Sequence, residues 1–374
     1  MSGKKNRKTQ LFKIFCEASG YGSLAFFCLK RNRIAIPKKI LLLRFSSIGD
    51  IVLTTPVIRA LQQRLGAEIH FLTKIAFASL LEPNPYVRRV YVFEKEVTEV
   101  LDELRRERYD LVVDLHHNLR SWRVKHALSV PARSFHKLNV EKWLLVNFKI
   151  DRLPDRHIVD RYLDTVSPLG VRNDGAGLDF FWPKNFRPIF LPDWQSKRRP
   201  FLALAIGAGY PTKTLTIHQL ATICRSIPYP VLLLGGPSEV DKSEAILQQL
   251  DSATAGRVRS IVGQCTLAES AWWIQQSTVV LAGDTGLMHI AAALRKPLVT
   301  VWGNTVPAFG MTPYLPTGNE PASNFEVNGL ACRPCSKIGH PACPKGHFRC
   351  MLDQSLTAIV AAVLERFEKV GNKK

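Results

Sequence analysis

Residues 282–294, AGDTGLMHIAAAL, decide the fold, because they run from an apolar strand through Asp-Thr-Gly into a helix of small residues. The residues just before them, STVVL at 277–281, are short, β-branched and apolar, as in a buried parallel strand. The turn leaves backbone N–H groups unpaired at the positive end of the helix dipole, which favours an anion such as a diphosphate. Gly286 would let that ligand approach the backbone. Taken alone, the same residues would also fit a helix capped by Asp284 without a ligand.

Strand and helix patterns alternate in two series, which predicts two doubly wound halves. The first series has expected strands at 40–45, 68–72, 90–93 and 110–115, with helices at about 51–65 and 97–108. The second series has expected strands at 201–206, 231–234, 258–261, 278–281 and 298–301, followed by a last helix at about 354–370. Ligands of such folds bind at the carboxyl ends of the strands, so the cleft between the two halves is the expected site.

The chain has 374 residues, of which 46% are hydrophobic, and this length suits two domains. The stretch 174–200 is rich in Pro, Asp, Arg and aromatic residues without a period, which indicates an interdomain linker. We therefore expect a basic N-terminal extension, a first domain, a linker, a second domain with a cysteine-rich segment at 332–350, and a C-terminal helix. Their expected bounds are 1–37, 38–180, 181–200, 201–352 and 353–374.

The chain carries 51 Lys and Arg against 31 Asp and Glu, a net charge of +20, so its partners are expected to be anionic. A nucleic acid, a membrane surface and a phosphorylated small molecule all fit that charge. No RNA-binding or zinc-finger signature stands clear of the strand and helix pattern, and we therefore expect no nucleic-acid partner.

The N-terminal extension is strongly basic, with Glu17 as its one acid. Its apolar runs at 11–15 and 24–29 are interrupted by charges and glycines, so it falls short of a membrane-spanning helix. The broken run and the lack of a small-residue cleavage site also disfavour a signal peptide. An interfacial membrane anchor and a disordered basic tail both fit, and the choice stays open.

Three motifs carry a resemblance: RFSSIGDIVLTTP at 44–56, GGPSE at 235–239 and GDTGLMHIAAAL at 283–294. In this order, each at the end of an expected strand, they resemble glycosyltransferase family 9, the ADP-heptose:lipopolysaccharide heptosyltransferases. The resemblance covers roughly 38–367. It implies an α/β fold of the GT-B type, with two facing Rossmann-like doubly wound domains and an interdomain cleft. The acceptor would bind mainly to the N-terminal domain and the sugar nucleotide to the C-terminal one.

The same resemblance implies an inverting bacterial enzyme of lipopolysaccharide biosynthesis that moves a heptose from ADP-heptose to an anionic inner-core acceptor. Such an enzyme would lie in the cytoplasm, peripherally at the inner face of the cytoplasmic membrane. No DxD-like pair of carboxylates follows an expected strand, which agrees with catalysis that needs no metal and no cofactor. Another sugar nucleotide handled by the same residues is the alternative. A membrane-associated protein that binds sugar nucleotides without turnover is a second alternative.

Two residues are expected to carry catalysis. Asp50 ends the loop after the first strand, and the resemblance implies that it is the general base; its alternative role is an ordinary helix N-cap. Lys213 lies in the loop after the first strand of the second domain, where similar enzymes carry a lysine that pairs with phosphate. A surface lysine is the alternative there, and this chain departs from the Lys-Arg-Trp of many relatives. Retention of both residues favours an enzyme over a binding protein.

The turn after the fourth strand of the second domain supplies most of the expected donor contacts. The backbone of Thr285, Gly286 and Leu287 would bind the diphosphate. The resemblance implies that Asp284 binds a hydroxyl of the transferred sugar, and capping of the turn is its alternative. His289, one helical turn further on, would face the phosphates or pack in the core.

Two more residues are expected on the nucleotide. Glu239 follows the Gly-Gly-Pro turn and can accept two hydroxyl hydrogen bonds, which matches a ribose-binding carboxylate in similar enzymes. Its alternative is an exposed acid in the first turn of a helix. Cys265 falls where the resemblance places the nucleobase pocket, so adenine is inferred from the family alone.

The acceptor is expected at the end of the fourth strand of the first domain, within DLHHNLRS at 114–121. His116, Arg120 and Arg123 would bind an acidic or phosphorylated saccharide there, together with Ser47. A solvated basic face is the alternative for either arginine.

Half of the eight cysteines fall in one segment as Cys332, Cys335, Cys343 and Cys350. This spacing fits a structural zinc site, which a reducing cytosol favours over two disulfides. Free thiols that pack a loop remain the alternative. We expect no catalytic role for them.

Overall fold

The computed structural model describes residues 36–189, 191 and 199–372. The predicted basic extension and its proposed membrane anchor therefore lie outside the described residues, apart from their last positions. Part of the predicted linker lies outside them as well. None of the helices in the described part of the chain combines the length and apolarity that a bilayer crossing needs.

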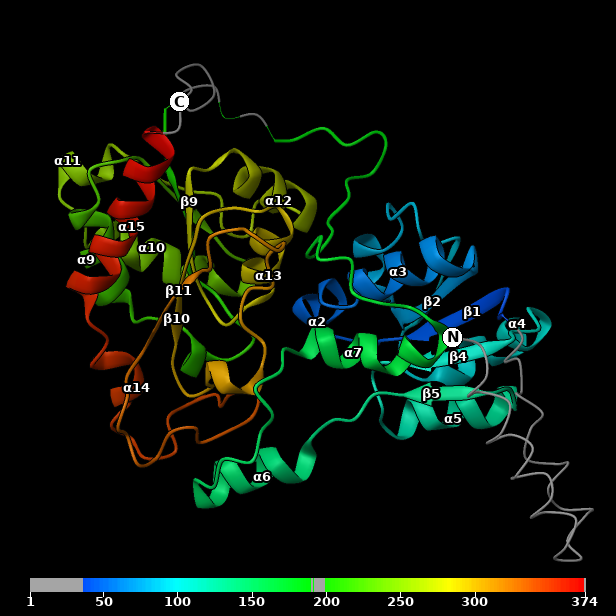
Figure 1. The fold of residues 1–374 in the computed structure, drawn as a ribbon. Helices are drawn as coiled ribbons and strands as arrows, with labels where there is room; N and C mark the ends of the chain where they lie inside the picture. The colour runs from blue at the N-terminus through cyan, green and yellow to red at the C-terminus, as the bar shows by residue number, and fades with distance from the viewer. Residues whose placement is uncertain (1–35, 190, 192–198, 373–374) are drawn as a thin grey trace, which may run out of the picture. The chain divides into compact units, whose positions relative to one another are not determined.

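The first half is built on a five-stranded sheet in the order β3-β2-β1-β4-β5, and every neighbouring pair is parallel (Figure 1). The strand order changes direction at β1, so the carboxyl ends of β1 and β4 border the switch point at which doubly wound sheets bind ligands. The strands are β1 (Lys39–Leu43), β2 (Glu68–Lys74), β3 (Arg89–Phe93), β4 (Leu111–Asp114) and β5 (Ala132–Ser134). The helices are α2 (Ile48–Val52), α3 (Thr55–Leu65), α4 (Leu101–Arg106), α5 (Leu119–Leu128), α6 (Asn139–Phe148) and α7 (Ile158–Val166), with 3-10 turns η2 (Ile75–Leu80), η3 (Val97–Val100) and η4 (Ser167–Leu169).

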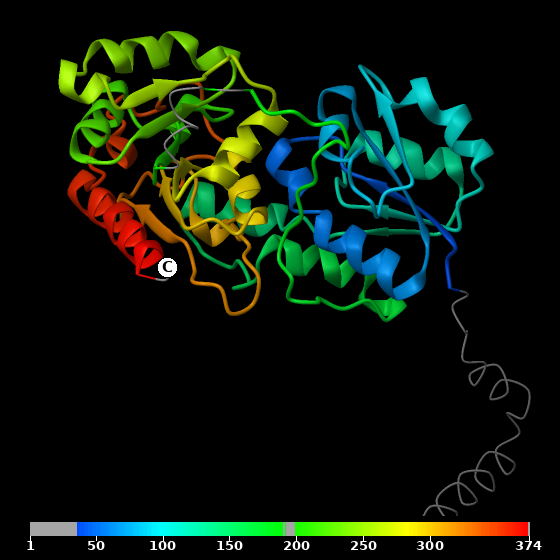
Figure 2. The same cartoon turned by 90° about the horizontal axis from the view of Figure 1, so that it is seen from above.

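The second half repeats the plan with a six-stranded sheet in the order β11-β10-β9-β6-β7-β8, again parallel throughout (Figure 2). Its switch point lies between β6 and β9. The strands are β6 (Leu202–Ala205), β7 (Val231–Leu234), β8 (Val258–Ser260), β9 (Val279–Gly283), β10 (Leu298–Trp302) and β11 (Ser323–Glu326). The helices are α9 (Ile217–Ser226), α10 (Val240–Gln248), α11 (Ser252–Ala255), α12 (Leu267–Gln276), α13 (Gly286–Ala293), α14 (Arg349–Leu352) and α15 (Leu356–Gly371), with 3-10 turns η5 (Pro211–Lys213), η6 (Pro237–Glu239) and η7 (Pro307–Phe309).

Both faces of β1 are buried, which explains its uninterrupted apolar run. Ile40 and Leu42 point into the larger apolar core, whereas Leu41 and Leu43 point to the opposite face into another core. This alternation is the period of two of a strand, and a parallel strand that is covered on both faces reads as continuously hydrophobic. The larger core also takes in Ala203 of β6, so apolar packing continues into the second half.

The predicted single helix at about 51–65 is wrong, because the chain forms α2 and α3 with a break at Leu53 and Thr54. Pro56 lies in the first turn of α3, and proline there starts a helix because it has no N–H to donate. The hydroxyls of Thr54 and Thr55 donate to the last carbonyls of α2 at 2.7 Å. The break lets α2 start at Ile48, directly after the loop that follows β1.

Two short edge strands were missed, and one predicted helix has a different form. Neither β5 nor β11 has a fully buried residue, so neither carries the apolar run by which a strand is recognised.

The predicted helix at 97–108 begins as the 3-10 turn η3 and continues as α4. The loop that follows β5 matters for the site, because it carries Lys137.

Candidate functional site

A cavity of about 900 Å³ lies between the two halves, lined from the carboxyl ends of β1, β4, β6, β7 and β9. Most of the residues predicted for the site line it. They are Ser47, Asp50, His116, Lys213, Glu239, Cys265, Asp284, Thr285, Gly286, Leu287 and His289. The position agrees with the rule that ligands of parallel sheets bind beyond the carboxyl ends of the strands.

The first turns of α2 and α13 meet at this cavity, at two glycines that lie on opposite sides of the contact (Figure 1). A β-carbon on Gly286 would lie 2.6 Å from Ile48 Cγ2, and one on Gly49 would lie 2.5 Å from His289 Cδ2. The side chain of Ile48 fills the space where a side chain on Gly286 would lie, while Gly286 itself lines the cavity, so the prediction that it admits a ligand to the backbone stays a prediction.

Asp50 lies in the first turn of α2 and is not its N-cap, which is Ser47. Both the backbone N–H and the hydroxyl of Ser47 donate to Asp50 Oδ2, at 3.2 and 3.0 Å. Its other oxygen, Oδ1, pairs with Arg44 at 2.6 Å. The carboxylate is thus held in place, with 20% of its side chain exposed toward the cavity.

Arg44 fixes the charge state of Asp50. Its guanidinium donates to the carbonyls of Ser46 and Leu115 and to the Tyr162 hydroxyl, at 2.7–2.9 Å. Burial alone would raise the pKa of Asp50, but the charge of Arg44 and the hydrogen bonds from Ser47 outweigh it and lower the pKa below its usual value. Asp50 therefore carries its negative charge at neutral pH.

Lys213 and Asp284 form an ion pair at the carboxyl edge of the second sheet. Lys213 Nζ lies 2.7 Å from Asp284 Oδ2, which also accepts a hydrogen bond from the Thr305 hydroxyl at 2.9 Å. Only 14% and 13% of the two side chains are exposed. The pairing brings a cation beside the first turn of α13, whose N-cap is Thr285.

The remaining residues predicted for the nucleotide also line the cavity. Glu239 accepts hydrogen bonds at 2.7 Å from the Gly236 N–H and the Ser238 hydroxyl, and it packs where Gly207 has no side chain. Burial raises the pKa of the Cys265 thiol to about 11, so it is neutral. His289 is 2% exposed, its Nδ1 has no hydrogen-bond partner among the described residues, and burial lowers its pKa.

The prediction for the acceptor side is corrected in part. Ser47 and His116 line the cavity, but Arg120 and Arg123 do not. The Asn118 side chain caps the start of α5, and both arginines lie on this helix facing Glu96, at 3.7 and 3.3 Å. Burial, with the charges of nearby cations, lowers the pKa of His116 to about 4, so this imidazole is neutral.

Three lysines that the sequence analysis did not single out line the cavity in place of the two arginines. They are Lys137 after β5, Lys142 on α6 and Lys337 in the cysteine-rich segment. Lys137 was missed because β5 was not recognised as a strand, so nothing marked the loop behind it as facing the cleft. Lys337 lies two residues after Cys335, and a zinc-like spacing gave no sign that the segment borders the cavity.

The sulfur atoms of the four clustered cysteines are not arranged around one metal position in this structure. Within the described ranges, the group with three or more His, Cys, Asp or Glu ligand atoms within 4.8 Å of one another is Glu68, His70 and Glu107. Cys332 Sγ instead lies 3.7 Å from His347 Nε2. The predicted zinc site stays a prediction.

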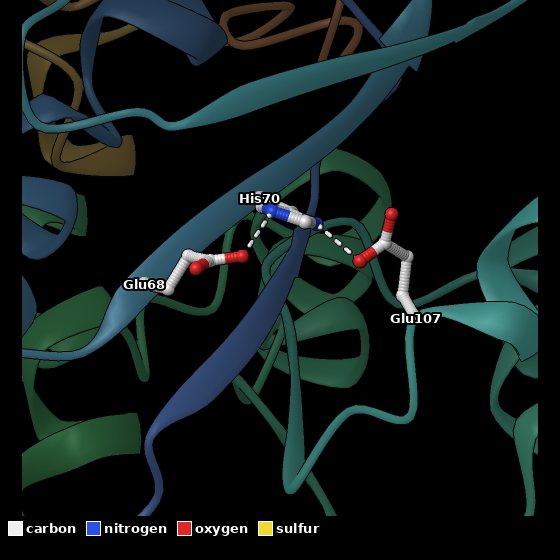
Figure 3. A group of neighbouring side chains, drawn as sticks. All are labelled: Glu68, His70 and Glu107. Atoms are coloured by element: carbon white, nitrogen blue, oxygen red, sulfur yellow. Dashed lines mark ion pairs between the residues drawn. The ribbon is translucent and has the colours of Figure 1, made fainter.

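The cluster of Glu68, His70 and Glu107 lies away from the cavity, at the amino end of β2. Figure 3 shows the two carboxylates on opposite sides of the imidazole ring, with His70 Nε2 2.9 Å from Glu68 and Nδ1 3.9 Å from Glu107. Lys39 Nζ pairs with both carboxylates, at 3.1 and 2.8 Å. Lys39 is therefore the cation that this structure places between the two carboxylates, and the cluster forms a charge network.

The comparisons with known proteins agree with this geometry. The model of glycosyltransferase family 9 (heptosyltransferase) matches residues 97–342. The lipopolysaccharide heptosyltransferase 2 of Salmonella typhimurium is 25% identical over 293 residues, which cover 72% of this chain and 84% of that protein. The lipopolysaccharide heptosyltransferase 3 of Escherichia coli (strain K12) is 26% identical over 290 residues, which cover 69% and 80%.

Two solved structures share the fold. The E. coli ADP-heptose lps heptosyltransferase II has a TM-score of 0.65 and 21% identity, covering 89% of this chain and 99% of that one. The glycosyl transferase family 9 protein of Veillonella parvula has a TM-score of 0.66 and 20% identity, covering 89% and 98%. With a family model that matches well over half of its length, the chain belongs to glycosyltransferase family 9 and is a transferase enzyme of the GT-B fold.

Proposed function

We propose that this enzyme transfers a heptose from ADP-heptose to the inner core of lipopolysaccharide, with inversion at the anomeric carbon. The observation that carries the proposal is that an ionised, oriented Asp50 and the Lys213–Asp284 pair beside α13 line one cavity from its two sides. A base on one side and cationic stabilisation on the other are what an in-line displacement needs. The names of the relatives supply the sugar and the acceptor.

In the proposed reaction an acceptor hydroxyl attacks the anomeric carbon while the bond from that carbon to the diphosphate oxygen breaks. The hydroxyl proton passes to Asp50, and ADP leaves with the electron pair of the broken bond. Arg44 and Ser47 hold the carboxylate in one orientation, so the base is positioned before the acceptor arrives. The negative charge that develops on the leaving diphosphate is balanced by Lys213 and the N–H groups of the 285–287 turn.

On the donor, Asp284 accepts a hydroxyl of the heptose and Glu239 accepts the ribose hydroxyls, while Cys265 borders the base. Asp284 Oδ2 lies 2.7 Å from Lys213 Nζ. The two oxygens of Glu239 each accept one hydrogen bond at 2.7 Å, from the Gly236 N–H and the Ser238 hydroxyl, so each carboxylate has lone pairs left. The anchored carboxylates thus have acceptor capacity left for the sugar. His289, buried at the edge of the cavity, packs against Gly49 of α2 and so supports α13 from the side of the first half.

We propose that catalysis needs no metal ion. The acids that line the cavity are Asp50, Glu239 and Asp284, and each is engaged by protein cations or N–H groups rather than arranged as a pair. Lys213 then supplies the charge that a divalent cation would otherwise bring to the diphosphate. Transfer at full rate in excess chelator supports this, and a rate that chelator abolishes and Mg²⁺ restores contradicts it.

The cysteine segment is a separate proposal, with a structural zinc as the bound ion. Burial and the neighbouring cysteines raise the pKa values of the Cys335 and Cys350 thiols, which indicates that the sulfurs share one neighbourhood. Zinc coordination would draw these sulfurs together and rigidify the segment. Metal analysis of the purified chain should find one zinc per chain, whereas a metal-free chain with reactive thiols at all four positions contradicts the proposal.

We further propose peripheral attachment to the cytoplasmic face of an anionic membrane, which would present a lipid-linked acceptor. Helix α6 exposes Val140, Trp143 and Phe148 by 67%, 55% and 58%, and the two aromatic rings pack edge to face. A helix with exposed aromatic residues on a chain of net charge +20 suits an interfacial position. A Trp143→Ser, Phe148→Ser variant should bind anionic vesicles more weakly than the wild type, whereas Trp122→Ser on α5 should not.

The decisive experiment measures transfer from ADP-heptose to a heptose-deficient lipopolysaccharide core, with calorimetric binding of ADP as the control. Wild-type transfer that Asp50→Asn abolishes while ADP still binds supports the proposal. ADP binding without transfer favours the alternatives, another donor sugar or a binding protein without turnover. No ADP binding at all contradicts the nucleotide assignment.

A further inference from the structure

Three lysine ammonium groups face the cavity on its acceptor side without a counter-ion. Lys137, Lys142 and Lys337 come from the loop after β5, from α6 and from the cysteine-rich segment. Within the part of the chain that the structure describes, none of the three ammonium groups makes an ion pair or a hydrogen bond. The other cations of the cavity, Arg44 and Lys213, are each paired with a carboxylate at 2.6 and 2.7 Å.

Lys337 and Arg44 act on both of the other lysines. Burial lowers the pKa of Lys142 to about 8, and the charges of Arg161, Lys337 and Arg44 contribute to this. Burial, Arg44 and Lys337 also lower the pKa of Lys137. The acids that oppose the effect are Asp50 for both lysines and Asp114 for Lys137, and these acids are already paired with Arg44 and Lys125. Positive charge is therefore in excess here.

The packing of α6 shows that the lysines are held at the cavity. Leu145 of α6 packs with Val306 and Phe309 of the second half in a small apolar core. Lys142 Nζ lies 5.7 Å from the centre of the Phe309 ring, a cation–π contact that holds the side chain on the inner side of the helix. At the end of α6, Lys149 Nζ donates to the Pro334 carbonyl at 2.7 Å, which ties the helix to the segment that carries Lys337.

We propose that Lys137, Lys142 and Lys337 form an anion subsite that binds a carboxylate or phosphate of the acceptor saccharide. This inference rests on the proposed function and names the acceptor group that the enzyme selects. The subsite is distinct from the proposed diphosphate position, because Lys213 is already paired with Asp284 beside α13, whereas Lys137 and Lys142 belong to the first half and act on the side of Asp50. Lys337 lines the same cavity from the second half. An anion bound here would bring the attacking hydroxyl of the same saccharide to Asp50 and would orient it for attack.

The test measures equilibrium binding of a heptose-deficient lipopolysaccharide core to the full chain in the presence of ADP, together with the acceptor KM. Lys142→Gln and Lys137→Gln should each weaken acceptor binding about tenfold or more, as expected for the loss of a charge-assisted contact. Lys142→Arg should keep most of it. ADP affinity should stay unchanged in every variant, which also shows that the variants fold.

Lys296 offers a matched control outside the cavity. Burial lowers its pKa to about 8, as for Lys142, and it donates to the Gln275 carbonyl at 3.1 Å, so Lys296→Gln removes a similar charge elsewhere. Its acceptor binding should equal that of the wild type. A Lys142→Gln, Lys137→Gln variant that binds the core as tightly as the wild type would overturn the subsite.

Two modified acceptors distinguish the sources of the anion. A core treated with phosphatase loses binding if the lysines hold a phosphate, and a core with its sugar carboxylates reduced to alcohols loses binding if they hold a carboxylate. Wild-type affinity for both modified cores would overturn the subsite. If the lysine variants lose binding but the wild type transfers no sugar, the subsite stands and the proposed transfer fails.

Discussion

The imidazole of His289 occupies the space where a side chain on Gly49 would lie, with a separation of 2.5 Å between that β-carbon and His289 Cδ2. Gly49 lies in the first turn of α2 in the first half, and His289 lies in α13 of the second half. This contact sets the distance between α2, which carries Asp50, and the turn at 285–287 that starts α13. That distance thus depends on a residue that has no side chain.

Gly49→Ala should therefore impair transfer and stability together. The added methyl group overpacks the α2–α13 contact, which we expect to cost about 1–3 kcal/mol and to reduce transfer by pushing Asp50 away from the donor. Denaturant unfolding and steady-state rates measure the two effects. Gly256→Ala, where the nearest atom would lie 3.6 Å away, is the control and should change neither. A Gly49→Ala variant with wild-type stability would contradict the contact.

Arg44 should determine the pH dependence of transfer through Asp50. In the wild type the pKa of Asp50 lies below its ordinary value of 3.8, so this carboxyl should contribute no loss of kcat/KM on the acid side near neutrality. Arg44→Met removes the charge that opposes the burial of Asp50 most strongly and leaves only the hydrogen bonds from Ser47, so the pKa of Asp50 should rise and activity should fall as the pH is lowered. The lowered pKa also means that ionised Asp50 stabilises the wild-type fold above pH 3.8 and loses this effect below it.

The control for this profile is Arg156→Met, which removes an exposed arginine paired with Asp164 at 2.6 Å. Its pH profile should match that of the wild type. If Arg44→Met binds ADP normally and its kcat/KM depends on pH in acid as that of the wild type does, another group is the base.

Lys213→Gln should lower kcat more than it raises the KM for the donor, because the charge on the leaving diphosphate grows in the transition state. Loss of one such preorganised contact typically costs about 100-fold in kcat. Lys213→Arg keeps the charge and should recover part of the rate, since its guanidinium can still pair with Asp284. A variant whose KM rises while its kcat stays unchanged would show that Lys213 only binds the ground state.

The two sheets and the loops that carry the site could be predicted from the sequence because their strands are buried on both faces. Uninterrupted apolar runs mark such strands, and the loops after them necessarily meet at the carboxyl edge. The structure brings Asp50, Lys213 and Glu239 to the cavity for this reason. The short edge strand β5 has no such run, so Lys137 behind it could not be placed.

Contacts between the halves could not be predicted either, because they depend on residues far apart in the sequence. The fit of Ile48 against Gly286 and of His289 against Gly49 requires both sheets to be folded and facing. The arginines of α5 were predicted at the cleft but lie outside it. Arg120 and Arg123 follow a strand that ends at the cleft, but the cap at Asn118 starts a helix that turns them toward Glu96.

The network of Lys39, His70 and Glu107 should govern stability in acid without affecting transfer. Hydrogen bonds from Lys39 and Tyr91 lower the pKa of Glu107 from 4.5 to about 2, so its ionised form stabilises the fold above pH 4.5 and this contribution is lost as the pH falls toward 2. Glu107→Gln should lower the Tm at pH 7 by about 2–4 °C, and its stability should depend less on pH in acid.

The control is Glu103→Gln. The Glu103 side chain is half exposed and lies 3.5 Å from Arg89, so its loss should change the Tm less. Transfer by Glu107→Gln should stay at the wild-type rate, because the cluster lies at the amino end of β2. Added zinc should affect the Tm of Glu107→Gln and of the wild type equally. A zinc-dependent rise in Tm that Glu107→Gln abolishes would show that a metal can displace Lys39 after all.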